Sequence, residues 1–178
     1  MTRANAELAN SFGNLAQRTL SMIAKNMDGK LEELIPAAPD RKLRGIVRDA
    51  CLTELPRDFE RLAFSQGIEA WLRAVYACNQ YVDEQAPWAL RKTDFERMKV
   101  VLQTLFMALR DLAIAIQPVV PEKAKALLDQ IGIPDDERSF ADLPDSDWYL
   151  RLVESGFTIG KPTPIFPRLE LPEEESAA

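Results

Sequence analysis

The chain has 178 residues, 47% of them hydrophobic and 28% charged, which is an ordinary balance for one globular domain with a sizeable core. Its formal net charge of -6 counts against a broadly basic nucleic-acid surface, although phosphate contact depends on local rather than total charge. Histidine is absent, which excludes a Ser–His–Asp triad, a Cys–His nucleophile pair and a histidine-based zinc site.

The first predicted element is a helix over residues 5–25, where apolar side chains recur at helical spacing. Asp28 and Gly29 then form a stop signal. Gly13 lies in the middle of this helix at a cost of about 1 kcal/mol relative to alanine. We therefore expect Gly13 to allow the close approach of another backbone.

A second face of this helix carries Asn10, Asn14 and Arg18, which recur at every fourth position and so share one side. Asparagine offers donor and acceptor atoms, and arginine offers a planar fork of donors. Together they can read base edges or hold phosphate. Taken alone, the three residues also fit a solvated polar face.

The middle of the chain predicts a proline-containing linker over residues 31–40, a helix over 41–52 and a long helix over 57–85. Pro56 suits the first turn of the long helix. Pro87 ends it, because proline cannot continue the hydrogen-bond ladder.

Pro87 also sets the direction in which Trp88 leaves the helix. An aromatic ring that stacks on one nucleic-acid base contributes about 1–3 kcal/mol. Arg91 and Lys92 follow closely, and we expect them to contact phosphate. The alternative for Trp88 is a lid packed over the core, since tryptophan is highly buried on average.

Thr93 and Glu96 have the spacing of a capping box, which predicts the start of a helix over residues 94–117. Apolar side chains surround most of this helix and predict a central place in the core. A short helix follows from Pro121 to a C-cap at Gly132.

Beyond residue 134 the helical pattern weakens. We expect residues 1–134 to form the helical domain and residues 135–170 to form an extension that packs on the bundle or on a missing catalytic domain. Within the extension, residues 147–154 predict a helical turn and residues 158–169 a proline-rich extended segment. Residues 171–178 predict a disordered acidic tail.

Neither a metal site nor a catalytic residue is predicted. Cys51 and Cys78 lie far apart, and we interpret both as small core residues of a reducing compartment. The chain has no apolar run near the roughly 20 residues that a membrane span needs. Its N-terminus lacks the apolar segment of a signal peptide, so we expect a cytoplasmic protein.

Two stretches together carry a family resemblance: Asn–Leu–Ala–Gln–Arg at 14–18 and Tyr–Val–Asp–Glu–Gln–Ala–Pro–Trp at 81–88. They resemble the C-terminal anticodon-binding domain of methionyl-tRNA synthetases, which are class I aminoacyl-tRNA synthetases. The similarity is best over residues 5–29 and 74–134, and it includes Pro–Ile–Phe–Pro–Arg at 164–168.

The resemblance implies a helix bundle that binds the CAU anticodon of methionine tRNA. It implies that Trp88 stacks on an anticodon base and that Asn14 and Arg18 hydrogen-bond to it, with Asn10 and Pro87 in supporting places. It also implies a synthetase that uses ATP and methionine.

The catalytic half of such a synthetase is missing from this sequence. A chain without histidine has no His–Ile–Gly–His motif, and there is no Lys–Met–Ser–Lys–Ser motif, glycine-rich phosphate loop or zinc-knuckle cysteine set. Met1 begins just before the stretch that opens the domain, so we expect a separated domain or a C-terminal fragment. It should not aminoacylate alone, and we expect ATP and methionine to bind the missing domain.

The predicted fold is therefore an all-α, single-domain bundle of about five helices with an extended proline-rich C-terminal strap. The expected partners are methionine tRNA and the catalytic domain of the same synthetase, with neither DNA nor a membrane. The alternative function is a helical protein-interaction module that docks a separate catalytic subunit. A solvent-facing Trp88 beside Arg18 favours RNA, and a buried Trp88 favours the alternative.

Overall fold

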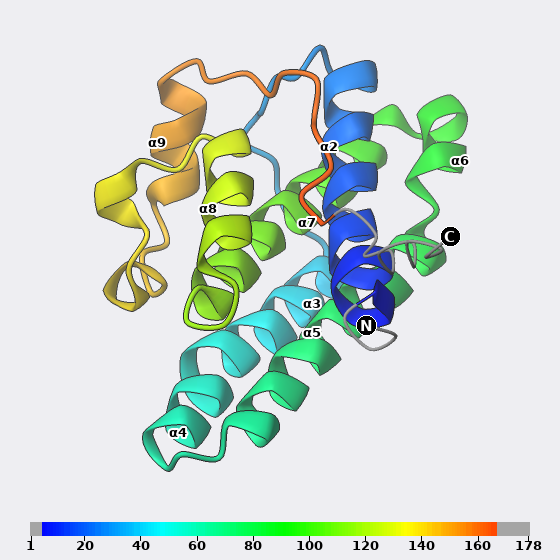
Figure 1. Ribbon diagram of the computed structural model, residues 1–178. Coiled ribbons are helices and arrows are strands. Elements are labelled where there is room, and N and C mark those ends of the chain that lie inside the picture. Colours follow the sequence, from blue (N-terminus) through cyan, green and yellow to red (C-terminus); the bar gives the residue numbers. More distant parts are fainter. Residues whose placement is uncertain (1–4, 167–178) are drawn as a thin grey trace, which may run out of the picture.

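The structure is a computed structural model that describes residues 5–166 as a bundle of helices joined by turns and loops (Figure 1). Within these residues there is no strand, and one isolated bridge pairs Lys30 with Thr158. The predicted all-α fold class is confirmed. No helix of the described part is long and apolar enough to cross a membrane.

The first helical stretch consists of η1 (Asn5–Gly13), a π-helix, and α2 (Asn14–Asn26), which continues it. The predicted helix over residues 5–25 is thus confirmed, although its first nine residues have the wider π geometry. Asp28 and Gly29 end it in the left-handed conformation, with φ of 52° and 72°. The side chains of this stretch that reach the core are Phe12, Leu15, Ala16, Thr19, Leu20 and Ile23.

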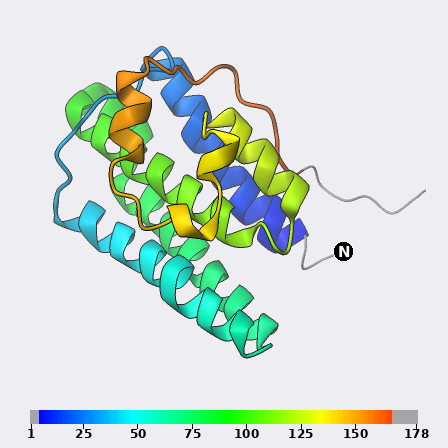
Figure 2. The ribbon, with the colours of Figure 1, turned by 90° about the vertical axis from the view of Figure 1, so that its left-hand side faces the viewer.

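An arm of two antiparallel helical stretches follows (Figure 2). Its outward stretch comprises α3 (Ala38–Asp49), η2 (Ala50–Glu54), a π-helix, and α4 (Leu55–Glu60). Leu62 then turns the chain with a left-handed φ of 60°, and α5 (Phe64–Gln85) runs back alongside.

The prediction of one helix over residues 57–85 is therefore wrong. Pro56 lies in the first turn of α4, as its chemistry favours, but α4 continues α3 rather than α5. The two stretches pack closely because Gly67 has no side chain: a Cβ there would lie 2.7 Å from the ring of Phe59. The reversal itself uses Leu62, a residue type that rarely adopts positive φ.

After α5 the chain forms α6 (Pro87–Thr93) and α7 (Phe95–Ile116). The predicted capping box is wrong by one residue. Asp94 caps α7 by accepting the backbone N–H of Arg97 at 3.0 Å, and the Thr93 hydroxyl instead bonds back to the carbonyl of Ala89 within α6. Helix α7 is buried along nearly its whole length, which confirms its central place in the core.

The C-terminal part returns over the bundle through α8 (Pro121–Gln130), η3 (Asp135–Glu137), η4 (Phe140–Asp142) and α9 (Trp148–Glu154). The predicted short helices opened by Pro121 and over residues 147–154 are confirmed. The rings of Trp148 and Tyr149 each lie 6.1 Å from the ring of Phe106 on α7, so α9 packs on the central helix.

Residues 157–166 form an extended strap along α2 (Figure 1). The backbone N–H of Ile159 donates to the carbonyl of Gly29 at 2.8 Å, and the ring of Phe166 lies 6.0 Å from that of Phe12. A Cβ on Gly13 would lie 3.2 Å from the Cβ of Phe166, so a segment does approach Gly13 closely, but it does so with the side chain of Phe166 rather than with its backbone. The predicted tail over residues 171–178 lies outside the described residues, and the domain boundaries stay predictions.

Both cysteines are core residues, as predicted. Cys51 and Cys78 are buried and carry free thiols. Burial raises the pKa of both, that of Cys78 to about 12, so neither is a ready thiolate nucleophile.

Replacing Gly29 by alanine is expected to destabilise the protein, because a Cβ there would lie 2.2 Å from the carbonyl oxygen of Ile159. The left-handed backbone alone costs an alanine about 1–2 kcal/mol, and displacement of the strap adds to that. Chemical denaturation measures the loss. Gly45→Ala is the matched control, since nothing lies within 4 Å of its Cβ position and a helical alanine should stabilise by about 0.5–1 kcal/mol. An unaltered unfolding midpoint in Gly29→Ala would mean that the strap does not pack on this turn.

Candidate nucleic-acid interface

Trp88 and Arg18 meet on the surface where α6 lies beside α2. Trp88 is 47% exposed, and the guanidinium carbon of Arg18 lies 5.3 Å from the centroid of its ring. At this distance the cation interacts with the face of the aromatic ring. Arg18 also lies 3.9 Å from a carboxylate oxygen of Asp83 on α5. The side chains from two predicted site segments, 70 positions apart in sequence, are thus brought together.

The backbone just before Trp88 fixes this arrangement. Ala86 has a left-handed conformation, with φ 44° and ψ 58°, and so turns the chain between α5 and α6. Pro87 is buried and occupies the first turn of α6, where its missing N–H is no loss. Trp88 is therefore presented from a short, anchored helix rather than from a flexible end.

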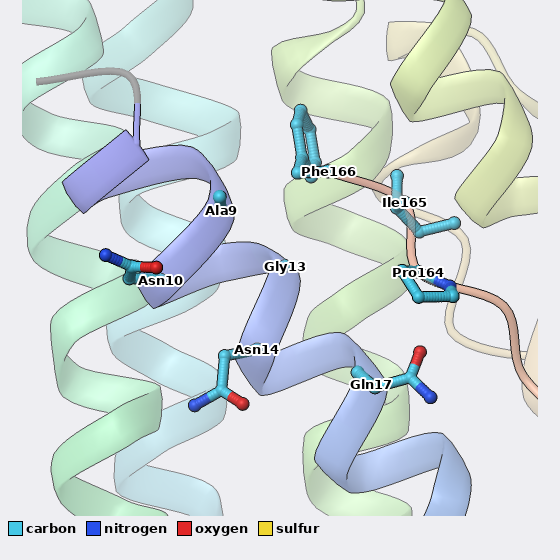
Figure 3. A pocket seen from close by; sticks show the side chains of 8 residues that line it. All are labelled: Ala9, Asn10, Gly13, Asn14, Gln17, Pro164, Ile165 and Phe166. Carbon is cyan, nitrogen blue, oxygen red and sulfur yellow. The ribbon is translucent and has the colours of Figure 1, made fainter. Parts of the chain in front are cut away.

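Asn10 and Asn14 are exposed on the same stretch that supplies Arg18 (Figure 3). Asn14 opens α2, whereas Asn10 belongs to the π-helix η1. Their amides point to the side of α5, away from the strap.

A groove of about 330 Å³ lies between this stretch and the strap (Figure 3). Gln17 projects toward it, and its amide nitrogen donates weakly to the Ser21 hydroxyl at 3.3 Å and to the carbonyl of Pro162 at 3.5 Å. The amide oxygen of Gln17 is buried without a hydrogen-bond partner. The groove is lined by Ala9, Asn10, Gly13, Asn14, Gln17, Pro164, Ile165 and Phe166.

Sequence reasoning did not identify Gln17 or the strap as neighbours of the asparagines. The one signal was Gly13, whose missing side chain admits Phe166.

Arg91 and Lys92 lie exposed near the end of α6. The guanidinium of Arg91 donates to the side-chain oxygen of Asn26 at 3.4 Å, which places it beside the end of α2. Arg91 and Lys92 of α6 and Arg18 of α2 thus supply three cationic side chains in a chain whose total charge is -6, and the carboxylate of Asp83 offsets part of the charge of Arg18. Local charge of this kind is what phosphate contact needs.

A buried polar cluster beneath this surface joins three helices. Asp40 of α3 is fully buried and accepts both Arg97 nitrogens, Nη1 at 2.6 Å and Nη2 at 2.7 Å, from α7. It also accepts the hydroxyl of Tyr81 on α5 and the backbone N–H of Ala37. Burial opposes ionisation of Asp40, but these hydrogen bonds outweigh it and hold its pKa below the usual value. No sequence pattern indicated this cluster.

Comparison with known proteins gives consistent matches. A family model described as the anticodon binding domain of methionyl tRNA ligase matches residues 47–177. A methionine–tRNA ligase of Rhizobium meliloti is 38% identical over 172 residues, which cover 97% of this chain and 33% of the relative. One of Brucella suis is 39% identical over 178 residues, covering 99% and 33%.

Solved structures agree in fold. The free-state crystal structure of Mycobacterium tuberculosis methionyl-tRNA synthetase matches with a TM-score of 0.86 and 35% identity, over 96% of this chain and 34% of that one. The same enzyme bound by methionyl-adenylate matches with a TM-score of 0.84 and 34% identity, over 93% and 32%. The chain spans about one third of the length of these relatives.

Proposed function

The chain belongs to the family of methionyl-tRNA ligase anticodon-binding domains, and on this basis we propose that it recognises the anticodon of methionine tRNA. Since it matches one third of each relative, we propose that it supplies recognition and that the remaining part of a synthetase supplies catalysis. In this proposal ATP and methionine bind that other part, which is also the protein partner, and the chain alone does not aminoacylate.

The observation that carries the proposal is the half-exposed ring of Trp88 with the Arg18 guanidinium above it. Unpaired RNA bases are commonly recognised by stacking on aromatic side chains and by hydrogen bonds to their edges. A base of the CAU anticodon that stacks on Trp88 lies within reach of the donor fork of Arg18. Asn14 then adds donor and acceptor atoms from the same helix face.

The surrounding residues have supporting roles in this proposal. Pro87 holds the turn that presents Trp88, Asn10 extends the amide face, and Arg91 and Lys92 contact phosphate. The geometry supports RNA over the alternative of a helical protein-docking module, because that alternative expects a buried Trp88. DNA and membranes are not proposed partners. The free, buried cysteines support a reducing location, which we propose is the cytoplasm.

The test is binding of the purified chain to a methionine tRNA anticodon stem-loop and to the same stem-loop with its first anticodon base changed. We expect the CAU form to bind at least about fivefold more tightly, which corresponds to ~1 kcal/mol from hydrogen bonds that the changed base cannot make. Fluorescence anisotropy with labelled RNA measures both dissociation constants.

Affinity should fall only modestly with salt, since few cationic side chains line the surface. Equal, weak binding to the two stem-loops would refute free-standing anticodon recognition. Equal binding with a steep salt dependence would replace it by general binding to the RNA backbone.

A further inference from the structure

The four residues from Gln85 to Trp88 form an elbow that decides where the Trp88 ring points. Ala86 provides the turn in a left-handed conformation that is unfavourable for any residue with a Cβ. Such a conformation persists only when contacts around it hold it in place. The backbone bonds at the elbow are local: the N–H of Ala86 donates to Val82 at 2.9 Å, and the carbonyl of Ala86 accepts the N–H of Ala89 at 2.8 Å. They hold each helix end but do not fix α6 relative to the rest of the bundle.

Arg97 supplies a contact from outside the elbow. Its Nη2 donates to the side-chain oxygen of Gln85 at 2.6 Å, one residue before the left-handed Ala86. Its backbone N–H donates to the carboxylate of Asp94, the residue that directly follows α6. Arg97 is therefore hydrogen-bonded to the chain both before α6, at Gln85, and after it, at Asp94.

Arg97 is in turn held rigidly. Both of its terminal nitrogens bond to the two carboxylate oxygens of Asp40, a bidentate geometry that fixes the plane of the guanidinium. Asp40 is anchored by Tyr81 and Ala37 and is fully buried. Through Arg97, Gln85 is thus linked to α7 and, by way of Asp40, to α3. Neither helix carries a candidate RNA-contacting side chain.

We propose that Arg97 is a positioning residue for anticodon recognition: clamped by Asp40, it holds the elbow so that Trp88 stands beside Arg18. The inference rests on the proposed function for its biological meaning, but the positioning of the Trp88 ring is a property of the free protein and is measurable without RNA. A residue that only stabilised the bundle as a whole would not single out Trp88 among the three tryptophans of the chain.

The test uses two variants of the full chain. Arg97→Lys keeps the positive charge but loses the planar guanidinium. The single ammonium group of lysine is not expected to bond to Asp40 and Gln85 at the same time as the guanidinium does. Gln85→Ala removes only the acceptor on the elbow and leaves the buried ion pair intact. Arg73→Lys is the matched control, because Arg73 also pairs with a carboxylate, that of Glu54 at 2.5 Å, but on the arm and not at the elbow.

Two readouts separate positioning from stability. The chain has three tryptophans, so 5-fluorotryptophan labelling gives three ¹⁹F NMR resonances, and Trp88→Phe assigns the one of interest. We expect Arg97→Lys and Gln85→Ala to shift or broaden the Trp88 resonance while those of Trp71 and Trp148 stay in place. We also expect the preference for the CAU stem-loop to fall at least about threefold in both variants, with no change in Arg73→Lys.

An unchanged Trp88 resonance in folded Gln85→Ala would overturn the proposal, as would a change of all three resonances together, which describes a general loosening of the core. If wild-type protein does not prefer the CAU stem-loop, the proposed function fails, and the ¹⁹F spectra of the variants still decide whether Arg97 positions Trp88.

Discussion

Trp88→Ala is expected to weaken binding of the methionine tRNA anticodon stem-loop by about 1–3 kcal/mol, roughly five- to 150-fold in the dissociation constant. The substitution removes the only large aromatic surface that the structure presents beside Arg18, among the described residues. The ring is half exposed and lies on a surface helix, so its loss should alter the unfolding free energy little. Calorimetric titration of wild type and variant measures the difference directly.

Two controls make the result specific. Trp88→Phe keeps a stacking surface and should retain most of the affinity. Phe64→Ala removes another half-exposed aromatic ring, at the start of α5 near the tip of the arm, and should leave RNA binding unchanged. If Trp88→Ala binds as tightly as wild type, Trp88 does not contact the RNA and the interface lies elsewhere.

The sequence was informative where one local pattern determines the structure. Helical spacing located η1 and α2 as one stretch and identified α7 as the central helix, because periodic burial needs only neighbouring residues. The turn at Leu62 was missed, since leucine seldom adopts positive φ and no glycine or asparagine marks the reversal. The packing of Phe59 over Gly67, which stabilises that turn, depends on two residues that no short-range pattern links.

The candidate site likewise combines features that a short stretch of sequence indicates with features that only the assembled fold creates. A family resemblance in two short stretches brought Arg18 and Trp88 together as candidates, and the structure has them in contact. Their assignment to RNA binding stays a prediction until the stem-loop experiment is done. The cluster of Asp40 with Arg97 joins positions 57 residues apart through a fully buried carboxylate. Nothing in the linker sequence distinguishes this aspartate from an exposed one, because its burial comes from the assembly of three helices.

Arg110→Met is expected to lower the free energy of unfolding by about 3–5 kcal/mol, the usual cost of removing one partner of a buried ion pair. Arg110 is 1% exposed and donates to Asp111 at 3.0 Å and to the backbone carbonyl of Asp142 at 2.7 Å. Its guanidinium also lies 4.9 Å from the ring centroid of Trp148. The variant therefore loses one of the contacts that join the C-terminal segment to α7, the hydrogen bond to Asp142, and leaves Asp111 without its counter-charge. Urea denaturation at neutral pH measures the loss.

The double variant Arg110→Met/Asp111→Leu separates these two causes. Burial raises the pKa of Asp111, and the adjacent Arg110 only partly opposes this, so the ionised carboxylate weakens the folded state. Without Arg110 the folded-state pKa rises further above the unfolded value of about 3.9. The free energy of unfolding that Arg110→Met loses relative to wild type should therefore be largest at neutral pH and shrink as the pH falls toward that value.

The double variant has no carboxylate at position 111. It should therefore recover much of the lost free energy of unfolding, and the loss that remains should depend little on pH. A deficit in Arg110→Met that is equal at neutral pH and at about pH 5 would assign the whole loss to the contacts with Asp142 and Trp148 instead.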